Sequence, residues 1–382
     1  MTRPLPLRGF ATTLVAALAL AVVAGCSGET SSESSEQGSA TTNTAAQVDL
    51  PPVTADYTWP EASTPEGHYP VTVKSCGEDV TFDKAPERAV VNDNNMVEMM
   101  FALGLTDHMA AYSAAGPRLR IAAFKDDYEA VTDMGPDYFK LEPTMKQNPD
   151  FVFSGWNYGF SEGGITPDTL AELGVKSYVL SESCRRIDDT LAPATIEEWY
   201  GDMRNLAAIF GVPERAEALI KHWDERLARV EEHLPENYTP VPTFSYDWGT
   251  ENIGGGLGLT IVPELYRKAG AVNVFEDLLE MWGGVSWEAF VEKRPEWIVV
   301  TDYGGRAWSG EERIAFLKSR EGIDTVPAIK NENYLILPQS AVNPGIRIVD
   351  GIETLASTLY PEEFKDLVGT EGFGLPPTYD VS

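Results

Sequence analysis

Positive charge and histidine are both scarce in this chain of 382 residues. Lysine and arginine number 29 against 59 acidic residues, which gives a formal net charge of −30, and histidine occurs four times. This excess of negative charge excludes a nucleic-acid surface and argues against electrostatic adhesion to anionic lipids. The histidines neither cluster nor show the spacing of metal ligands: His68, His108, His222 and His233. A site for a bare zinc or manganese ion is therefore not expected.

Familiar catalytic motifs are missing as well. The sequence has no G-x-S-x-G elbow, no H-E-x-x-H motif and no cysteine with a plausible histidine partner. The glycine-rich run at 254–258 lacks the Gly-Lys-Ser/Thr ending of a phosphate-binding loop, so we interpret it as a mobile loop beside a cleft. Asp247 and Asp302 could form a carboxylate pair, but such pairs are easily found in a chain this acidic. An enzyme is therefore not predicted, although an exported hydrolase and a structural surface lipoprotein stay open as alternatives.

The beginning of the chain has the pattern of an export signal. Arg3 and Arg8 precede an apolar stretch at 10–23, and small residues lead to Cys26. This pattern resembles the lipobox of bacterial lipoproteins, which predicts a signal peptide at 1–25 and a lipid anchor, including palmitate, on Cys26. An ordinary signal peptide or a single anchor helix are the alternatives. Residues 26–55 are polar and small, which predicts a disordered tether, and no later run is apolar enough to span a bilayer.

Cysteine is scarce too, with three in the chain. Once Cys26 is assigned to the anchor, Cys76 and Cys184 remain in a compartment that permits oxidation. We predict that they form a disulfide, which would close a loop of roughly a hundred residues and contribute ~4 kcal/mol of stability. Two buried free thiols are the alternative.

Two distant segments of the sequence follow the same pattern. Glu142 and Glu288 each open a short helix-like segment, a proline follows each at the same offset (Pro149 and Pro295), and an apolar strand-like run comes next. One such unit is common, whereas two with matched offsets indicate two similar lobes. A cleft between two lobes is a usual place for a small ligand.

The rest of the chain alternates predicted strands and helices, which favours parallel sheets. A long amphipathic helix over residues 213–234 follows Pro213 and is long enough, at ~30 Å, to brace both lobes, although it could belong to one lobe alone. We therefore predict an α/β fold of two Rossmann-like lobes, each with a central sheet, joined by this helix and with the ligand cleft between them. The expected boundaries are 69–210 for the N-terminal lobe, 213–234 for the bridging helix and 240–382 for the C-terminal lobe.

The order of these features resembles a known family. The lipobox, the segment from Pro86 to Val91, the Glu142 unit, the long helix and the Glu288 unit occur in the order found in substrate-binding lipoproteins of ABC importers for ferric siderophores, cobalamin and haem. More narrowly, the chain resembles the actinobacterial iron-siderophore branch of this family, and the resemblance covers residues 69–360. It implies an exported monomer, lipid-anchored on the outer face of the cytoplasmic membrane, that binds a ferric siderophore and needs no cofactor of its own. Cobalamin and haem are the alternative ligands.

The resemblance also implies how the protein meets its transporter. A glutamate on each lobe docks onto arginines of the ABC permease dimer, and the matching residues are Glu142 and Glu288. Two charged points on one face would fix the docking orientation. The alternative is that each glutamate only stabilises the N-terminus of its helix through the helix dipole.

Candidate ligand residues follow the predicted strands, because ligands of parallel α/β sheets sit at the carboxyl ends of strands. Aromatic faces suit a bulky, partly apolar chelate, whereas amides and arginines suit its oxygen atoms. The expected contacts are Asn94, Trp156, Tyr158, Tyr246, Trp248, Tyr303, Arg306, Arg118 and Arg347. The shortage of histidine weakens a haem site, although Tyr158, Tyr246 and Tyr303 keep it open.

Overall fold

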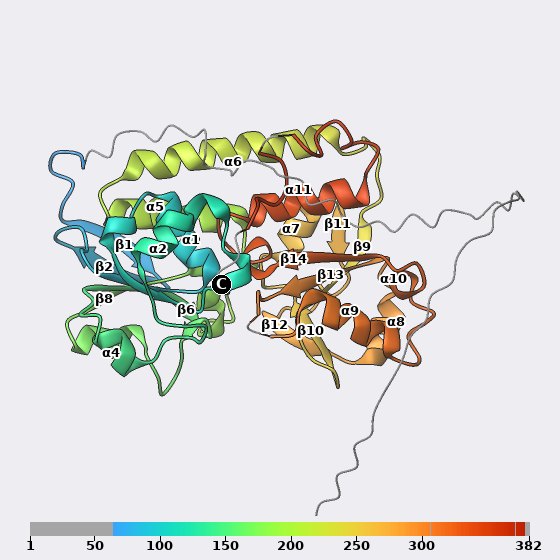
Figure 1. Cartoon of the computed structure of the whole chain (residues 1–382), viewed down its shortest axis with the longest axis horizontal. Coiled ribbons are helices and arrows are strands. Elements are labelled where there is room, and N and C mark those ends of the chain that lie inside the picture. Colours follow the sequence, from blue (N-terminus) through green and yellow to red (C-terminus); the bar gives the residue numbers. More distant parts are fainter. Residues whose placement is uncertain (1–63, 306, 371, 379–382) are drawn as a thin grey trace, which may run out of the picture. The chain divides into compact units, whose positions relative to one another are not determined.

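A computed structural model describes residues 64–305, 307–370 and 372–378 (Figure 1). The predicted signal peptide, the anchor Cys26, the whole of the predicted tether and the candidate ligand residue Arg306 lie outside the described residues. The described part belongs to one compact unit.

The first lobe is built on a parallel sheet preceded by a hairpin. The hairpin strands β1 (Val71–Ser75) and β2 (Glu78–Phe82) pair antiparallel. The sheet has the order β5-β4-β3-β6-β7, with β8 also beside β6. Its strands are β3 (Ala89–Asn92), β4 (Met109–Ser113), β5 (Thr132–Asp133), β6 (Phe151–Trp156), β7 (Gly159–Phe160) and β8 (Lys176–Val179). The helices between them are α1 (Asn94–Ala102), α2 (Lys125–Ala130), α3 (Leu141–Met145) and α4 (Pro167–Glu172).

The second lobe repeats the arrangement with a parallel sheet in the order β11-β9-β13-β14. Its strands are β9 (Val241–Tyr246), β11 (Ala271–Asn273), β13 (Trp297–Asp302) and β14 (Tyr334–Pro338). Its helices are α7 (Val262–Lys268), α8 (Trp287–Lys293), α9 (Gly310–Ser319), α10 (Pro327–Lys330) and α11 (Ile348–Leu359). The predicted α/β fold with a parallel sheet in each lobe is confirmed.

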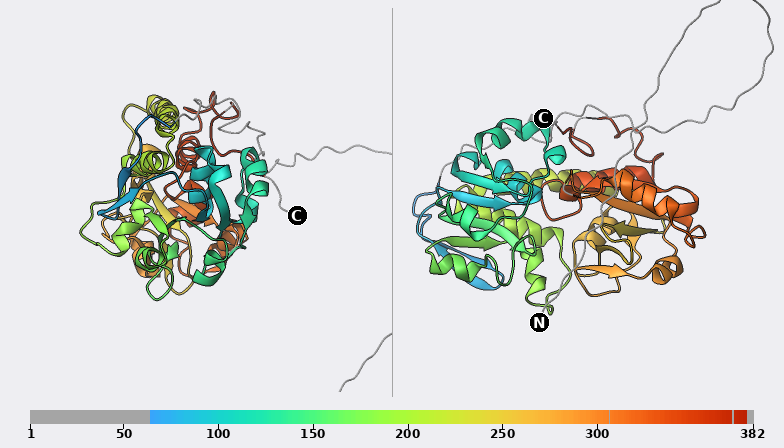
Figure 2. Two further views of the ribbon diagram at one scale, coloured as in Figure 1. Left: turned by 90° about the vertical axis from the view of Figure 1, so that its left-hand side faces the viewer. Right: turned by 60° about the horizontal axis from the view of Figure 1, so that its bottom comes forward.

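The long helix α6 (Pro213–His233) contacts both lobes. It packs on α5 (Ile196–Ile209) of the first lobe and on α11 and α7 of the second, and Figures 1 and 2 show it running along α5 and α11. The apolar face of this helix, which includes Leu219, Trp223 and Val230, is buried. The interpretation as a helix that braces both lobes is therefore correct, and the one-lobe alternative is not.

The prediction for the glycine-rich run was wrong. Residues Ile253–Gly256 form the buried strand β10, which pairs antiparallel with β12 (Trp282–Val285), rather than a mobile loop. A Cβ added at Gly255 would lie 1.8 Å from the carbonyl oxygen of Ser245, and one at Gly254 would lie 2.2 Å from the Trp248 ring. Glycine is needed here because β10 approaches β9 and Trp248 closely. A close approach of this kind is a common reason for glycine inside a strand.

The predicted disulfide between Cys76 and Cys184 is present in the structure. Cys76 occupies the turn between β1 and β2, and Cys184 lies in the 3-10 helix Ser181–Arg186 that follows β8. The Ser75 hydroxyl accepts a hydrogen bond from the Val179 N–H at 2.9 Å beside the bridge. The disulfide therefore attaches the hairpin to the body of the first lobe.

A buried ion cluster joins the bracing helix to α11. Arg226 of α6 donates from Nη2 to Asp350 at 2.7 Å and to Glu353 at 2.6 Å, and from Nε to Glu353 at 3.0 Å. All three side chains are at most 1% exposed. Burial raises the pKa of Asp350 to about 6 although the Arg226 charge opposes the shift. The cluster fixes the position of α6 on the second lobe because each charge depends on the others for compensation.

Polar contacts also cross directly between the lobes. Glu182, at the end of the first sheet, accepts a hydrogen bond at 2.9 Å from the N–H of Ile261, just before α7. Arg347, before α11, donates to the carbonyl oxygen of Leu119 at 2.8 Å. These contacts bind loops of one lobe to helix ends of the other.

The contact made by Glu182 should be visible in the pH dependence of stability. Burial raises the pKa of Glu182 to about 7. The folded chain thus keeps a proton that the unfolded chain loses near its ordinary pKa of about 4.5, so this group contributes stability that is lost as pH rises toward 7. The substitution Glu182→Gln keeps an acceptor for the Ile261 N–H but removes the titrating carboxyl. The decrease in the free energy of unfolding between low and neutral pH should therefore be smaller in the variant by up to ~3 kcal/mol.

The measurement is urea unfolding of the full chain and its variant at pH 5 and pH 8. Glu98 and Asp202 are also buried, with pKa values raised to about 7, so the unmodified chain should lose stability over this range and the variant should lose less. Glu172→Gln on the exposed face of α4 is the control and should behave as the unmodified chain. Equal losses in the Glu182→Gln variant and the unmodified chain would contradict the assignment.

Candidate functional site

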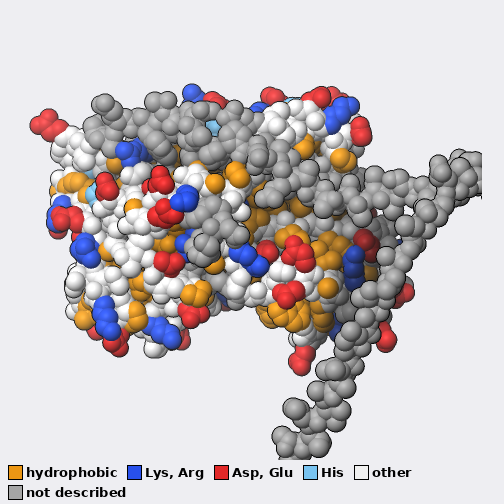
Figure 3. Space-filling model, in the orientation of Figure 1, with side chains coloured by type: hydrophobic (Ala, Val, Ile, Leu, Met, Phe, Trp, Pro, Cys, Tyr) orange, Lys and Arg blue, Asp and Glu red, His pale blue; other side chains and the backbone are white. Residues whose placement is uncertain are grey.

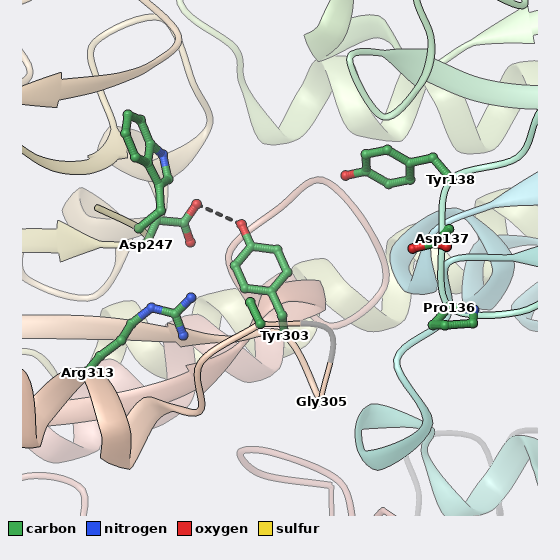
Figure 4. Close-up of a pocket in the computed structure, with 9 residues that line it drawn as sticks. Pro136, Asp137, Tyr138, Asp247, Tyr303, Gly305 and Arg313 are labelled. Carbon is green, nitrogen blue, oxygen red and sulfur yellow. Dashed lines mark hydrogen bonds between the residues drawn. The ribbon is translucent and has the colours of Figure 1, made fainter. Parts of the chain in front are cut away.

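A pocket of about 470 Å³ lies where loops of the two lobes face each other (Figure 4). The first lobe contributes the loop at 136–138, after β5, and the second contributes the loops after β9 and β13 and one residue of α9. Its lining residues are Pro136, Asp137, Tyr138, Asp247, Trp248, Tyr303, Gly305, Ala307 and Arg313. The loops follow the carboxyl ends of parallel strands, where open α/β sheets place their ligands.

A buried carboxylate and a tyrosine form one wall of this pocket. Asp247 is 3% exposed, and its Oδ2 accepts a hydrogen bond at 2.8 Å from the hydroxyl of Tyr303, drawn as a dashed line in Figure 4. Burial raises the pKa of Asp247. Burial, followed by the charge of Asp247, raises the pKa of Tyr303 well above its usual value. Tyr303 is therefore held as a neutral phenol whose proton points at a carboxylate.

Arg313 supports this wall from behind. It is 3% exposed, and its Nη1 donates to the carbonyl oxygen of Thr301 at 3.0 Å and to that of Trp308. Its guanidinium carbon lies 5.7 Å from the centroid of the Tyr303 ring. These contacts hold the ends of the loop between β13 and α9, so the position of Tyr303 depends on Arg313.

Two exposed aromatic side chains face the pocket from opposite lobes. Tyr138 is 36% exposed and Trp248 is 45% exposed. Figure 4 shows Tyr138 extending from the first-lobe loop toward the wall that carries Tyr303. Large aromatic surfaces that stay exposed inside a concave site are suited to stacking against a flat or bulky ligand.

The structure brings some of the predicted ligand residues to this pocket. Trp248 and Tyr303 line it. Arg118 is exposed and lies beside the edge of the pocket. A Cβ added at the lining residue Gly305 would lie 3.7 Å from Arg118 Nε. Arg306, in the same loop as Gly305, lies outside the described residues.

Three other predicted ligand residues are buried and make internal hydrogen bonds. Asn94 is 1% exposed, and its side-chain oxygen accepts from the Gly116 N–H at 2.6 Å. The Tyr246 hydroxyl donates to the carbonyl oxygen of Gly249 at 2.8 Å, and Arg347 donates to Leu119 and Ser340. Polar side chains at strand ends often satisfy neighbouring loop backbone in this way. The described pocket does not include these three residues.

The last two predicted residues, Trp156 and Tyr158, lie elsewhere in the first lobe. Trp156 lines a groove beside the disulfide and packs on Phe160. The Tyr158 hydroxyl donates to Glu182 at 3.5 Å and faces a small polar space between the lobes. Neither residue lines the pocket that contains Tyr303.

Sequence reasoning missed Asp137, Tyr138 and Arg313 as pocket residues. Asp137 and Tyr138 follow β5, which has two residues and therefore no detectable strand pattern. Arg313 lies on a helix, whereas ligand residues were expected in the loops that follow strands. The Gly135-Pro136-Asp137 turn before an exposed tyrosine was the available signal for the first two.

The two predicted docking glutamates occupy equivalent places in the two lobes. Glu142 is the second residue of α3 and Glu288 is the second residue of α8, and each helix leads into a strand of its sheet. The Glu142 side chain is 81% exposed and pairs with Lys146 at 2.9 Å. Glu288 is exposed, and hydrogen bonds from its own backbone and Ser286 lower its pKa. Both carboxylates are therefore on the surface, and neither is buried in the core.

Clusters of metal ligands and membrane-spanning helices are both missing from the described residues. No group of three or more His, Cys, Asp or Glu side chains in this part of the chain is placed to hold a metal ion. No helix among the described residues combines the length and apolar character needed to cross a membrane.

Comparison with protein families gives one match over most of the chain. Residues 90–341 match a family described as Periplasmic binding protein. Apart from the first residue of β3, this segment includes both parallel sheets, and it contains the bracing helix and every residue that lines the pocket.

Individual proteins resemble the chain more distantly. An uncharacterized ABC transporter substrate-binding lipoprotein, YvrC, of Bacillus subtilis is 23% identical over 305 residues, which is 78% of this chain and 88% of that protein. A vitamin B12-binding protein of Photorhabdus laumondii is 23% identical over 62% of this chain and 75% of its own length. Among solved structures, an ABC-type Fe3+-hydroxamate transport system protein from Saccharomonospora viridis superimposes with a TM-score of 0.67 at 23% identity, over 76% of this chain and 99% of that one.

Proposed function

Because the chain belongs to the periplasmic binding protein family, we propose that it is the substrate-binding lipoprotein of an ABC importer and captures a ferric siderophore in the pocket lined by Tyr138, Trp248 and Tyr303. The observation that carries this proposal is a pocket between two lobes that is lined by exposed aromatic side chains and by the hydrogen-bonded Asp247–Tyr303 pair. Its volume of about 470 Å³ falls in the range of small-molecule sites. The fold shared with the Fe3+-hydroxamate transport system protein of Saccharomonospora viridis also supports it.

The proposal also specifies how a ferric siderophore would be held in the pocket. Tyr138 and Trp248 would pack against the organic shell of the chelate, and the Tyr303–Asp247 pair would meet its polar atoms. The iron would arrive already coordinated, so the protein would supply complementarity rather than metal ligands. We infer binding and release without chemical change, and no enzymatic step.

Location and domain division are part of the same proposal. Residues 1–25 would be removed on export, and Cys26 would carry the lipid that holds the protein at the outer face of the cytoplasmic membrane. The lobes would extend over 69–210 and 240–382, with the bracing helix between them. The protein would act as a monomer, with Glu142 and Glu288 docking onto arginines of the permease dimer.

Cobalamin is the second candidate ligand. It is favoured by the match to a vitamin B12-binding protein over 62% of this chain. Haem is the third, but Tyr303 is a poor axial ligand because its proton is held by Asp247 and its pKa is raised well above the usual value. Metal ligation by tyrosine requires the phenolate.

Titration of tryptophan fluorescence would test the function. Trp248 is 45% exposed in the pocket wall, so a bound chelate should quench its emission. Ferric hydroxamate and catecholate siderophores, cobalamin and haem would be added separately to the full chain. Saturable quenching by at least one ferric siderophore at or below micromolar concentration is expected, and it should be reduced in a Trp248→Phe variant. Quenching by cobalamin or haem alone would overturn the siderophore assignment.

A further inference from the structure

The segment of chain that follows α11 leaves the second lobe and returns to the first. Its final described part, the strap, comprises residues 372–378. Thr378 forms an antiparallel bridge with Ile121 of the first lobe. Beside this bridge, the N–H of Ala122 donates to the carbonyl oxygen of Pro377 at 2.8 Å. The strap is therefore attached by its backbone to the first-lobe segment that lies between β4 and α2.

The beginning of the strap is fixed to the second lobe. The N–H of Gly374 donates at 2.6 Å to the carboxylate of Glu353, which belongs to the buried ion cluster with Arg226. Phe373 is 2% exposed, and its ring centroid lies 6.1 Å from that of Phe364. Because one end is held by the second lobe and the other is paired with the first, the strap connects the two lobes.

The first-lobe residues just before this attachment lie against the pocket. The loop at 116–119 packs on the pocket residue Tyr303 and its neighbour. A Cβ added at Gly116 would lie 2.7 Å from the carbonyl oxygen of Tyr303, and one added at Gly304 would lie 2.5 Å from Leu119 Cγ. These contacts leave no room for a methyl group on either side. A shift of the loop would therefore disturb this wall of the pocket.

The same loop places Arg118 at the edge of the pocket. Arg118 is exposed, and a Cβ added at the lining residue Gly305 would lie 3.7 Å from its Nε. Figure 3 shows acidic and basic side chains interspersed over the described surface in that view, without one broad basic patch. A single guanidinium beside the pocket is then useful to the oxygen atoms of a ligand, provided that its loop is held in place.

Other contacts also hold this loop, so separating it from the strap should loosen it without unfolding the lobe. Arg347 donates to the carbonyl oxygen of Leu119 at 2.8 Å, and the Gly116 N–H donates to Asn94 at 2.6 Å. Ile121 is 1% exposed and belongs to the main apolar core. The strap adds a further backbone contact at the end of the loop.

We propose that the strap is a positioning element of the ligand site. By holding residues 121–122 it fixes the loop at 116–119, and through this loop it fixes Arg118 and Tyr303 around the ligand. The inference rests on the proposed function, because it concerns the pocket to which that function assigns the ligand. A ligand that meets a loosened loop has to order it, and this ordering lowers the affinity. The strap thus affects binding without being among the described residues that line the pocket.

Two variants would separate the strap from the first lobe. In the full chain, Ala122→Pro removes the N–H that donates to Pro377. The local backbone should accept proline, because Ala122 is exposed and begins a short 3-10 helix, and Ile121 before it has φ −74° and ψ 140°. Ala122→Ser keeps the N–H and is the matched control. The second variant ends the chain at Leu375, which removes the bridge and keeps the contacts of the strap with the second lobe.

Titration of tryptophan fluorescence with ferric desferrioxamine B, ferric enterobactin and cobalamin as separate probes measures the effect on binding. For each probe that binds the full chain, Ala122→Pro should weaken binding about threefold and the shortened chain about tenfold, whereas Ala122→Ser should leave it unchanged. Hydrogen exchange of the amides at 116–121, measured without ligand, should be faster in the first two variants. Urea unfolding would show whether each variant is folded before it is titrated.

Unchanged affinity in both the Ala122→Pro variant and the shortened chain would overturn the inference and leave the proposed function intact. This holds even if exchange or stability changed, because the strap would then support the fold and not the site. Equal weakening by Ala122→Ser would also contradict it, since serine keeps the hydrogen bond. Failure of the full chain to bind any of the probes would overturn both the inference and the proposed function.

Discussion

Replacing Arg226 by methionine should destabilise the protein by about 3–5 kcal/mol. The substitution leaves two carboxylates, Asp350 and Glu353, buried at no more than 1% exposure without their shared cation. Charges taken out of water without compensation cost far more than the lost hydrogen bonds. Urea unfolding of the full chain, with and without the substitution, measures the difference.

The neighbouring arginine provides a matched control for this prediction. Arg229 lies one turn away on the same helix, is 38% exposed, and is 3.9 Å from Glu353, so Arg229→Met should cost less than about 1 kcal/mol. Adding Asp350→Asn and Glu353→Gln to Arg226→Met should restore part of the lost stability, because the buried charges are then removed. An Arg226→Met variant as stable as the control would show that the cluster does not fix α6 on the second lobe.

The Glu142→Ala, Glu288→Ala double variant should bind its ligand normally and fail to support uptake. Both side chains are exposed and neither lines the pocket, so their removal leaves the binding site unchanged. The expected loss of transport follows from removing the charged points that would orient the protein on the permease. Uptake of a radio-iron-labelled chelate by cells that carry the variant in place of the normal chain measures the effect.

Two other exposed glutamates, one on each lobe, serve as the control for docking. Glu172 lies on α4 and Glu292 lies on α8, one turn after Glu288. Changing both to alanine removes the same amount of charge from the same lobes and should leave uptake unchanged. If the docking pair lowered ligand affinity as much as uptake, or if both pairs impaired uptake equally, a specific docking role would be contradicted.

Several elements of the fold could be predicted from sequence because their signals are local. Helix α1 begins at Asn94, where Asp93 caps it, and the long helix α6 begins at Pro213 as expected for a proline in the first turn. Strand β4 was missed, because its sequence, Met109–Ser113, contains two alanines and no alternation of polar and apolar residues. Strand β10 was predicted to be a loop, because the close approach that requires Gly255 depends on a neighbouring strand.

The site was less predictable than the fold for a related reason. Trp248 and Tyr303 were found because both follow recognisable strands. Whether an aromatic or an arginine at a strand end faces a ligand or the protein interior depends on its tertiary partners, and Arg347 turned inward because Leu119 and Ser340 offer it acceptors. The pairing of Asp247 with Tyr303 joins residues 56 positions apart, and no sequence pattern of either residue indicates it.

The most direct test of the account is to locate iron in crystals of the full chain grown with a ferric hydroxamate. Anomalous scattering at the iron absorption edge identifies the metal without reference to the protein side chains. We predict one iron peak inside the pocket, between Tyr138 on one lobe and Trp248 and Tyr303 on the other. An iron peak elsewhere on the protein, or saturated crystals whose pocket holds no iron, would contradict it.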